Sequence, residues 1–150
     1  MKRTIGIVVV VGLCLLVIGL AVRMKNQRLV YYGSGMDPTI KSGSFIKMDR
    51  TAYNSASPRR GDIVSVQQSQ MLILRVVGTP GERIEVRGGV TYINGKRLVE
   101  PYAKPGGRDV FPTKLSSDEY FLLGDNRGKA NDSGNYGPVK KNSIIGKVKL

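Results

Sequence analysis

The sequence predicts an all-β protein: an antiparallel β domain that forms a closed or partly closed barrel, preceded by one transmembrane helix. Three observations support this fold class. An uninterrupted apolar run covers residues 5–22, short alternating apolar segments separated by turn residues follow after residue 28, and no long segment there shows helical periodicity. Many short strands with this spacing are typical of sheets that close on themselves.

The apolar run 5–22 is long enough to cross a membrane as a helix. Its 18 residues include no charged side chain. At about 1.5 Å per residue they span about 27 Å, close to the ~30 Å of a hydrocarbon core. No small-x-small cleavage site follows the run, so we expect an uncleaved anchor. The predicted domains are an anchor with flanking basic residues, 1–28, and one β domain, 29–150. Because the flanking charges nearly balance, charge bias does not orient the helix.

Five segments of the β domain have the apolar pattern of short strands. They cover residues 43–49, 61–67, 71–78, 83–93 and 119–124. The pair Asn94-Gly95 predicts a tight hairpin turn, because both residues tolerate positive φ angles. Residues 100–119 are rich in proline and glycine and predict a long loop or excursion.

The composition excludes several kinds of site. The chain has no histidine, which excludes Ser-His-Asp and Cys-His catalysis, and its single cysteine, Cys14, lies in the apolar run. An intrachain disulfide and a cysteine-based metal site are therefore excluded, and we expect no metal or cofactor. Five of the 24 basic residues flank the apolar run, so residues 29–150 have 19 basic and 11 acidic side chains. These basic residues are scattered without interleaved aromatics, which predicts proximity to a membrane rather than nucleic-acid binding.

Four phrases occur in order between about Tyr31 and Gly146. They are "GSGMDPTIKSGSFI", "GDIVSVQ", "LILRVVGTPGERIEV" with the later "YINGKRLVEPY", and "GDNRGKANDSGNYGPV". Together they resemble bacterial type I signal peptidases, membrane-anchored serine proteases that remove signal peptides on the outer face of the membrane. The resemblance implies an antiparallel β domain with a smaller β-rich excursion, located outside the cytoplasm.

The chemistry of that family is a Ser-Lys dyad, in which a neutral, desolvated lysine takes the proton of the serine. The family's serine directly precedes the Met of the Met-x-Pro phrase, and this position is Gly35 here. The family's lysine directly precedes the Arg-Val pair, and this position is Leu74 here. The resemblance thus implies that both members of the dyad are absent. Ser34 is a weak candidate to replace the serine, because neighbouring side chains on an extended segment point to opposite faces. Arg75 cannot replace the lysine as the base, because its guanidinium has a pKa above about 12 and keeps its proton.

The remaining motif residues are expected to form a peptide groove and its scaffold. The predicted groove residues are Met36, Pro38, Ile40 and Leu74. The predicted scaffold residues, several of them holding turns by side chain-to-backbone hydrogen bonds, are Arg75, Gly78, Pro80, Gly124, Asp125, Asn126, Asp132 and Ser133. Where the family has a serine near its lysine this chain has Ala130, and Gly134 stands at a position that the family fills with Arg.

These features predict a membrane-anchored signal-peptidase-like protein without hydrolase activity. Its expected role is a binding factor in assembly or secretion, with a secreted or pilin-like protein, or the signal-peptide region of one, as partner. The resemblance supplies a precedent, since signal-peptidase-like proteins without the dyad accompany pilus assembly in some Gram-positive bacteria. Two alternatives stay open: an active signal peptidase with an atypical dyad, and an inert anchor or decaying paralogue.

Overall fold

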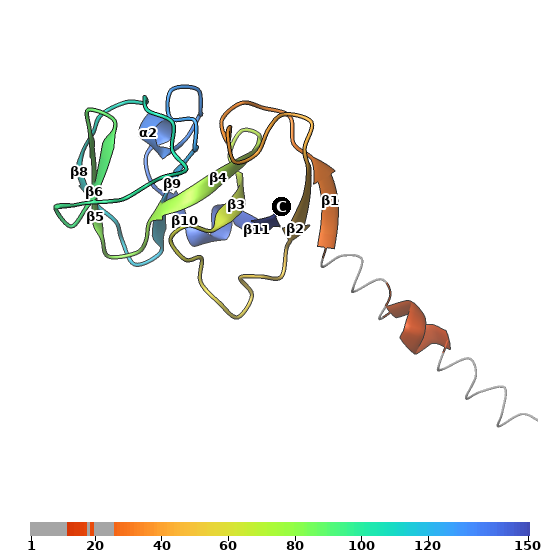
Figure 1. Ribbon diagram of the computed structural model, residues 1–150. Helices are drawn as coiled ribbons and strands as arrows, with labels where there is room; N and C mark the ends of the chain where they lie inside the picture. The colour runs from red at the N-terminus through yellow and green to blue at the C-terminus, as the bar shows by residue number, and fades with distance from the viewer. Residues whose placement is uncertain (1–11, 18, 20–25) are drawn as a thin grey trace, which may run out of the picture.

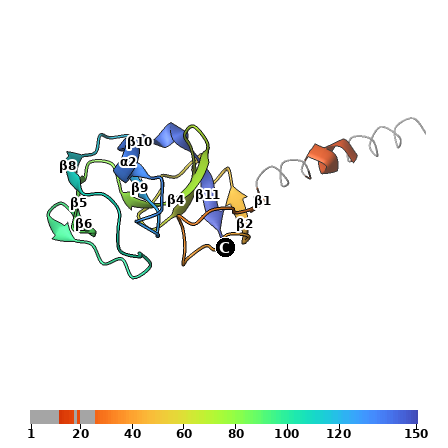
Figure 2. The same cartoon turned by 90° about the horizontal axis from the view of Figure 1, so that it is seen from above.

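The computed structural model describes residues 12–17, 19 and 26–150. Two antiparallel sheets make up the β domain. The larger has the strand order β1 (Asn26–Val30), β2 (Phe45–Asp49), β11 (Ile144–Lys149), β3 (Ile63–Gln67), β4 (Met71–Gly78), β9 (Glu119–Leu123) and β10 (Val139–Lys140). The smaller has the strand order β7 (Lys96–Arg97), β6 (Val90–Ile93), β5 (Arg83–Arg87) and β8 (Val110–Lys114). In Figures 1 and 2 the smaller sheet lies at one end of the domain and β1 and β2 lie at the other.

The predicted antiparallel β domain is confirmed. Residues 12–17 and 19 are helical, while most of the predicted span 5–22 lies outside the described residues. Within the described part of the chain, no helix is long and apolar enough to cross a membrane. The two short helices of the β domain are α2 (Ser133–Tyr136) and the 3-10 helix η1 (Lys141–Ser143).

All five predicted strand segments contain strands, and the predicted 83–93 segment is the hairpin β5–β6. The Asn94-Gly95 turn is confirmed between β6 and β7, with φ angles of 51° and 80°. Residues 100–119 are not all loop, because β8 pairs with β5. Its Pro112 is tolerated because β8 is an edge strand, where a missing N–H donor is not needed by a second neighbour.

Three apolar clusters fill the domain, and β4 contributes buried side chains to all three. Leu74 and Val76 point into the cluster on one side of the larger sheet, whereas Ile73 packs with Met36 and Ile40 on the other side. Between the smaller sheet and β4–β9 lies a third cluster of buried residues, formed by Val77, Ile84, Val86, Leu115, Phe121 and Leu123.

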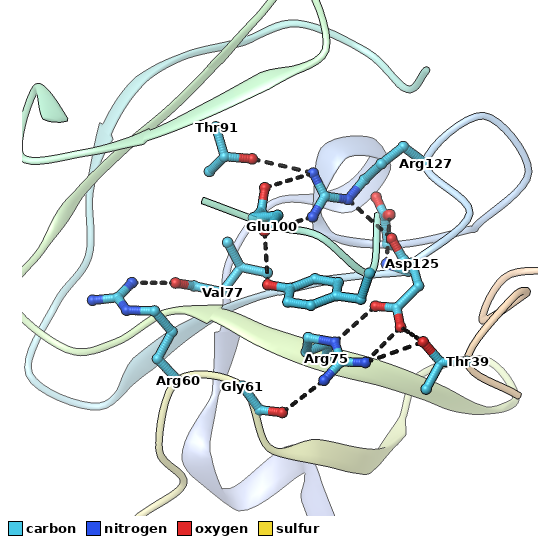
Figure 3. A network of polar contacts seen from close by, with 12 residues as sticks. Thr39, Arg60, Gly61, Arg75, Val77, Thr91, Glu100, Asp125 and Arg127 are labelled. Carbon is cyan, nitrogen blue, oxygen red and sulfur yellow. Dashed lines mark hydrogen bonds and ion pairs between the residues drawn. The ribbon is translucent and has the colours of Figure 1, made fainter. Parts of the chain in front are cut away.

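A buried ion pair joins β4 to the turn after β9 (Figure 3). Arg75 donates from Nε to Oδ1 of Asp125 at 2.8 Å and from Nη2 to Oδ2 at 2.5 Å. Its Nη1 donates to the Gly61 carbonyl at 3.0 Å, and Thr39 donates to the same Asp125 carboxylate. Burial alone lowers the pKa of Arg75, but the hydrogen bonds and charge of Asp125 outweigh it, so the pKa lies above its usual value and the guanidinium stays charged.

The polar network continues from Arg75 to the excursion between β7 and β8 (Figure 3). The Arg75 guanidinium lies 4.0 Å from the centroid of the Tyr102 ring, in cation–π geometry. The Tyr102 hydroxyl donates to Glu100, which also accepts two hydrogen bonds from Arg127 at 3.0 and 2.6 Å. Arg127 donates further to Thr91 of β6 at 3.2 Å. The chain of contacts fixes the smaller sheet to the strands that surround the cavity described below.

Replacing Asp125 by alanine should lower the free energy of unfolding by about 3–5 kcal/mol, because Arg75 would remain buried without its counter-ion. Urea denaturation followed by circular dichroism measures this change. The matched control is Asp37→Ala, which removes the partner of Lys104 in a solvent-exposed ion pair and should leave the midpoint nearly unchanged. Equal midpoints for the two variants would contradict the importance assigned to the buried pair.

Gly146→Ala should also destabilise the fold, by about 2–3 kcal/mol. A Cβ at Gly146 of β11 would lie 2.6 Å from the backbone carbonyl oxygen of Asp49, and backbone atoms cannot move aside cheaply. Thermal unfolding of this variant can be compared with that of Gly128→Ala, where an added Cβ approaches nothing closer than 4.0 Å. A Gly146→Ala variant as stable as the control would show that β11 can shift.

Candidate functional site

A cavity of about 420 Å³ lies between three segments that are distant in the sequence. Its walls come from residues 29–35, from residues 70–74 at the start of β4, and from residues 129–131 after β9, together with Ile46. The three positions singled out from the sequence, Gly35, Leu74 and Ala130, all line this cavity. The fold thus brings together positions that only the motif order had linked.

One edge of β4 is open beside this cavity. The first half of β4 pairs with β3 from Met71 to Leu74, whereas β9 pairs with β4 only from Arg75 onward. No strand in the described part of the chain pairs with the second edge of residues 71–74. Because an unpaired edge presents free N–H and C=O groups, an extended peptide can be added there as a further strand.

Gly35 is held in place by the residue that follows Asp125. The Asn126 backbone N–H donates to the Gly35 carbonyl at 2.9 Å, and the Asn126 side-chain amide donates to the Ser34 carbonyl at 3.0 Å. A Cβ at Gly35 would lie 3.4 Å from Ala130 and 3.8 Å from the Tyr31 hydroxyl, both ordinary contacts. A small side chain therefore fits at this position and would point toward Ala130 and Tyr31.

The predicted extended conformation around Ser34 is wrong. Residues 34–40 form a turn in which the Ile40 N–H donates to the Met36 carbonyl at 2.9 Å, and Asp37-Pro38 is a cis peptide. Strand alternation therefore gives no information on the direction of the Ser34 side chain. Ser34 is exposed and lines the cavity, and its hydroxyl makes no hydrogen bond to any described residue.

Leu74 lies in an apolar environment. It is 2% exposed and packs in a cluster of eight buried residues that also contains Val64, Tyr120 and Val139. The neighbouring Arg75 points to the other face and pairs with Asp125, as strand alternation predicts. The described residues near position 74 are thus mostly apolar and bury the side chain at this position.

The other predicted groove residues do not line the cavity. Met36 and Ile40 are 0% and 1% exposed and pack into the apolar cluster beneath the turn, while Pro38 is exposed on its outer side. A turn that returns on itself directs these two apolar side chains into the core. They support the loop that contains Gly35 from below.

The predicted scaffold residues hold the end of β9 by hydrogen bonds. Asp132 accepts from the Gly124 N–H at 3.0 Å and from the Gly134 N–H at 2.9 Å, and it caps α2. Burial raises the pKa of Asp132, and the two N–H donors oppose this effect. The Ser133 hydroxyl accepts from the Leu122 N–H at 3.0 Å. Gly124 is required by packing, since a Cβ there would lie 2.2 Å from the Ala130 Cβ.

The remaining two scaffold positions lie near the other end of β4. Gly78 is required by packing, because a Cβ there would lie 2.9 Å from the Cβ of Phe121, which cannot move without its backbone. Pro80 is half-buried in the turn between β4 and β5.

Tyr31 is a cavity residue that sequence reasoning missed. Its hydroxyl accepts a hydrogen bond from the Met36 backbone N–H at 3.3 Å, next to the place that a side chain at Gly35 would occupy. Burial raises the pKa of this phenol, so it stays protonated near neutral pH. No motif marks a tyrosine at this spacing. Glu100, Tyr102 and Arg127 were also missed as network residues, although they lie inside the quoted phrases.

Within the described part of the chain, no group of three or more carboxylate, histidine or cysteine side chains lies close enough together to hold a metal ion.

The comparisons with known proteins agree with the geometry. The family model described as signal peptidase, peptidase S26, matches residues 2–150. A signal peptidase I of Bacillus caldolyticus is 33% identical over 136 residues, covering 79% of this chain and 75% of the relative. Signal peptidase I V of Bacillus subtilis is 32% identical over 149 residues, covering 86% and 89%. The crystal structure of a signal peptidase I from Enterococcus faecalis aligns with a TM-score of 0.54 and 30% identity, covering 61% of this chain and 96% of that one.

The order of the motifs, the convergence of residues 35, 74 and 130 on one cavity, and the match along nearly the whole sequence lead to the same conclusion. The resemblance found in the sequence is confirmed, and the chain belongs to the signal peptidase family, peptidase S26.

Proposed function

We propose that this chain is a member of the signal peptidase family that binds peptides without cleaving them. The observation that supports this most directly is the lining of the cavity, where Gly35, Leu74 and Ala130 provide neither a nucleophile nor a base. In the family these positions hold the serine, the lysine and a serine near the lysine. Covalent catalysis by a hydroxyl requires a base within hydrogen-bonding distance, and these three residues do not supply one.

Other polar groups of the cavity are poor replacements for the dyad. The Tyr31 phenol keeps its proton because burial raises its pKa. Lys129 borders the cavity, but its side chain is exposed and lacks the burial that makes a lysine a usable base. Ser34 has a free hydroxyl without a hydrogen-bonded base among the described residues.

Peptide binding is supported by the open edge of β4 and the apolar walls of the cavity. An extended segment can hydrogen-bond to residues 71–74 while its side chains contact Leu29, Leu72 and Leu74. We infer that the ligand is a secreted or pilin-like protein, or its signal-peptide region, and that the role lies in assembly or secretion. The apolar run 5–22 would anchor the chain by a single span, with the β domain outside the cytoplasm of a Gram-positive cell.

The alternative function is an active signal peptidase with an atypical dyad. It is favoured by one observation, the exposed Ser34 hydroxyl on the wall of the same cavity. Cleavage assays on the full chain distinguish the two functions.

The full chain in detergent should bind a labelled signal-peptide segment, and Met71→Asp should weaken this binding about tenfold. Met71 lines the cavity and is 46% exposed, so the substitution removes apolar contact area without emptying the core. Fluorescence anisotropy measures the dissociation constant. The matched control is Phe111→Asp in β8 of the smaller sheet, which changes a 90% exposed side chain and should leave binding unchanged. Absence of binding by the unaltered chain would remove support for the proposed function.

The unaltered chain should not cleave a preprotein, whereas Gly35→Ser combined with Leu74→Lys should produce cleavage. The serine side chain fits beside Ala130, and the lysine would be desolvated by the apolar cluster. Mass spectrometry of the products detects cleavage at the signal-peptide boundary. Each single variant should be inactive. Cleavage by the unaltered chain that disappears in Ser34→Ala or Lys129→Ala would instead establish the enzymatic alternative.

Leu74→Lys alone should destabilise the fold by about 4 kcal/mol at pH 7, and the loss should shrink as the pH rises toward about 10.4. Burial lowers the folded-state pKa of a lysine, so the unfolded state binds more protons below pH 10.4 and stability rises with pH. Denaturant unfolding at pH 7 and pH 10 measures the trend. Leu74→Met, which keeps an apolar side chain of similar volume, should lose less than about 1.5 kcal/mol at both pH values. A pH-independent loss for Leu74→Lys would mean that position 74 is open to water.

A further inference from the structure

The open edge of β4 ends at a blocked position beside Gly35. Among the described strands, none pairs with the second edge of residues 71–74, and β9 occupies that edge from Arg75 onward. Gly124 directly follows β9, and a Cβ there would lie 2.6 Å from the Gly35 carbonyl oxygen and 2.2 Å from the Ala130 Cβ. The backbones are too close together for an extended chain to pass between them. A peptide added to residues 71–74 must therefore end at this position or turn out of the cavity.

Two backbone N–H groups at this end of the edge point at one side chain. The carbonyl groups of Ser34 and Gly35 both accept hydrogen bonds from Asn126. Because the C=O and N–H of a trans peptide unit point in opposite directions, the N–H groups of Gly35 and Met36 point away from Asn126. The Met36 N–H donates to the Tyr31 hydroxyl oxygen at 3.3 Å. Burial raises the pKa of this hydroxyl, and hydrogen bonds from the Met36 and Gly35 N–H groups partly offset the increase.

The Tyr31 hydroxyl therefore has a proton that it can donate into the cavity. A phenol oxygen has one O–H donor and accepts hydrogen bonds through its lone pairs. The two backbone N–H groups use its acceptor capacity, and no residue in the described part of the chain accepts from its O–H. Tyr31 is half-buried and lines the cavity, and a Cβ at Gly35 would lie 3.8 Å from its oxygen. A ligand at the blocked end of the edge would thus meet an O–H donor that the backbone holds in place.

The charges around this end favour an anion. Among the described residues that line the cavity, Lys129 is the only charged one, and none is an aspartate or a glutamate. Two carboxylates nearby in the chain are already bound, because Asp37 pairs with Lys104 and Asp132 accepts from two backbone N–H groups. An ammonium group in the cavity would be repelled by Lys129, whereas a carboxylate would be attracted by it and could accept a hydrogen bond from Tyr31.

We propose that the cavity preferentially binds peptides that end there with a free C-terminal carboxylate. The peptide would run parallel to β4 along residues 71–74, and its terminal carboxylate would accept from the Tyr31 hydroxyl and lie near the Lys129 ammonium. This inference rests on the proposed function, because it specifies which peptides the non-cleaving site binds.

A chain end of this kind is the product of a cleavage reaction. It forms when another protease adds water across a peptide bond, which leaves a carboxylate on one fragment and an ammonium group on the other. A signal-peptide region meets this requirement once it has been released. The chain would then act after cleavage, on a product, and not on the uncut precursor.

The test uses the full chain in detergent and one signal-peptide segment, labelled at its N-terminus, in three forms. The first ends in a free carboxylate, the second ends in a carboxamide, and the third continues beyond that end by several residues. Fluorescence anisotropy gives the three dissociation constants. We expect the carboxylate form to bind about tenfold more tightly than either of the others, because a hydrogen bond to a charged group and the attraction of Lys129 act only on it. This preference should decrease at high salt, since Lys129 is exposed.

Two variants test the residues. Tyr31→Phe removes the O–H donor and keeps the ring, and Lys129→Gln removes the charge and keeps a long side chain. Each should reduce the preference for the carboxylate over the carboxamide from about tenfold to about threefold or less. The matched controls, Tyr92→Phe and Lys96→Gln in the smaller sheet, should leave the preference unchanged. If Tyr31→Phe binds neither form because the loop at Gly35 has moved, the preference of Lys129→Gln decides.

Equal dissociation constants for the carboxylate and carboxamide forms would overturn the inference, while the proposed function would stand if both forms bind without being cleaved. Tighter binding of the extended form would also overturn it. Binding of none of the three forms would overturn the inference together with the proposed function. A carboxamide form that ends in aspartate and binds as tightly as the free carboxylate would assign the site to an acidic side chain and contradict the preference for a chain end.

Discussion

The bidentate ion pair between Arg75 and Asp125 is the interaction on which the geometry of the cavity depends. It is nearly excluded from solvent, and removing one partner would leave a buried charge uncompensated. Arg75 fixes the register of β4 and thereby the position of Leu74 beside it. Asp125 fixes the turn after β9, and the following Asn126 holds Ser34 and Gly35 by two hydrogen bonds. One ion pair thus positions both walls of the cavity.

On the proposed function, the same arrangement explains how a signal-peptidase scaffold can persist without the reacting groups. The network of Arg75, Asp125, Glu100 and Arg127 contributes to stability and does not need a nucleophile or a base. At position 74 a leucine adds about 1.5–3 kcal/mol of apolar burial, where a neutral lysine would lose part of it and a charged one would oppose folding. On the proposed function, the change at this position exchanges catalysis for stability, a common trade-off in active sites.

Much of the fold could be predicted from the sequence because its strands have local patterns and its hairpin has the Asn94-Gly95 signal. Strands β1, β8, β10 and β11 were missed, and they depend on partners distant in the sequence. For example, β11 inserts between β2 and β3, and β8 joins β5 despite Pro112. The importance of positions 35 and 74 was predicted from the order of the motifs. The turn at Ser34 was not predicted, because the residues around it show no apolar periodicity that would indicate its i to i+4 hydrogen bond. The role of Tyr31 was not predicted either, since it depends on the backbone N–H of Met36, five residues further along the chain.

The two faces of β1 have different surroundings. Side chains alternate along a strand, so Arg28 and Val30 lie on one side while Leu29, and Tyr31 just beyond the strand, pack with the apolar cluster that supports the turn at Gly35. On the proposed function, β1 therefore helps to hold the loop at Gly35 beside the open edge of β4, where an extended peptide would bind.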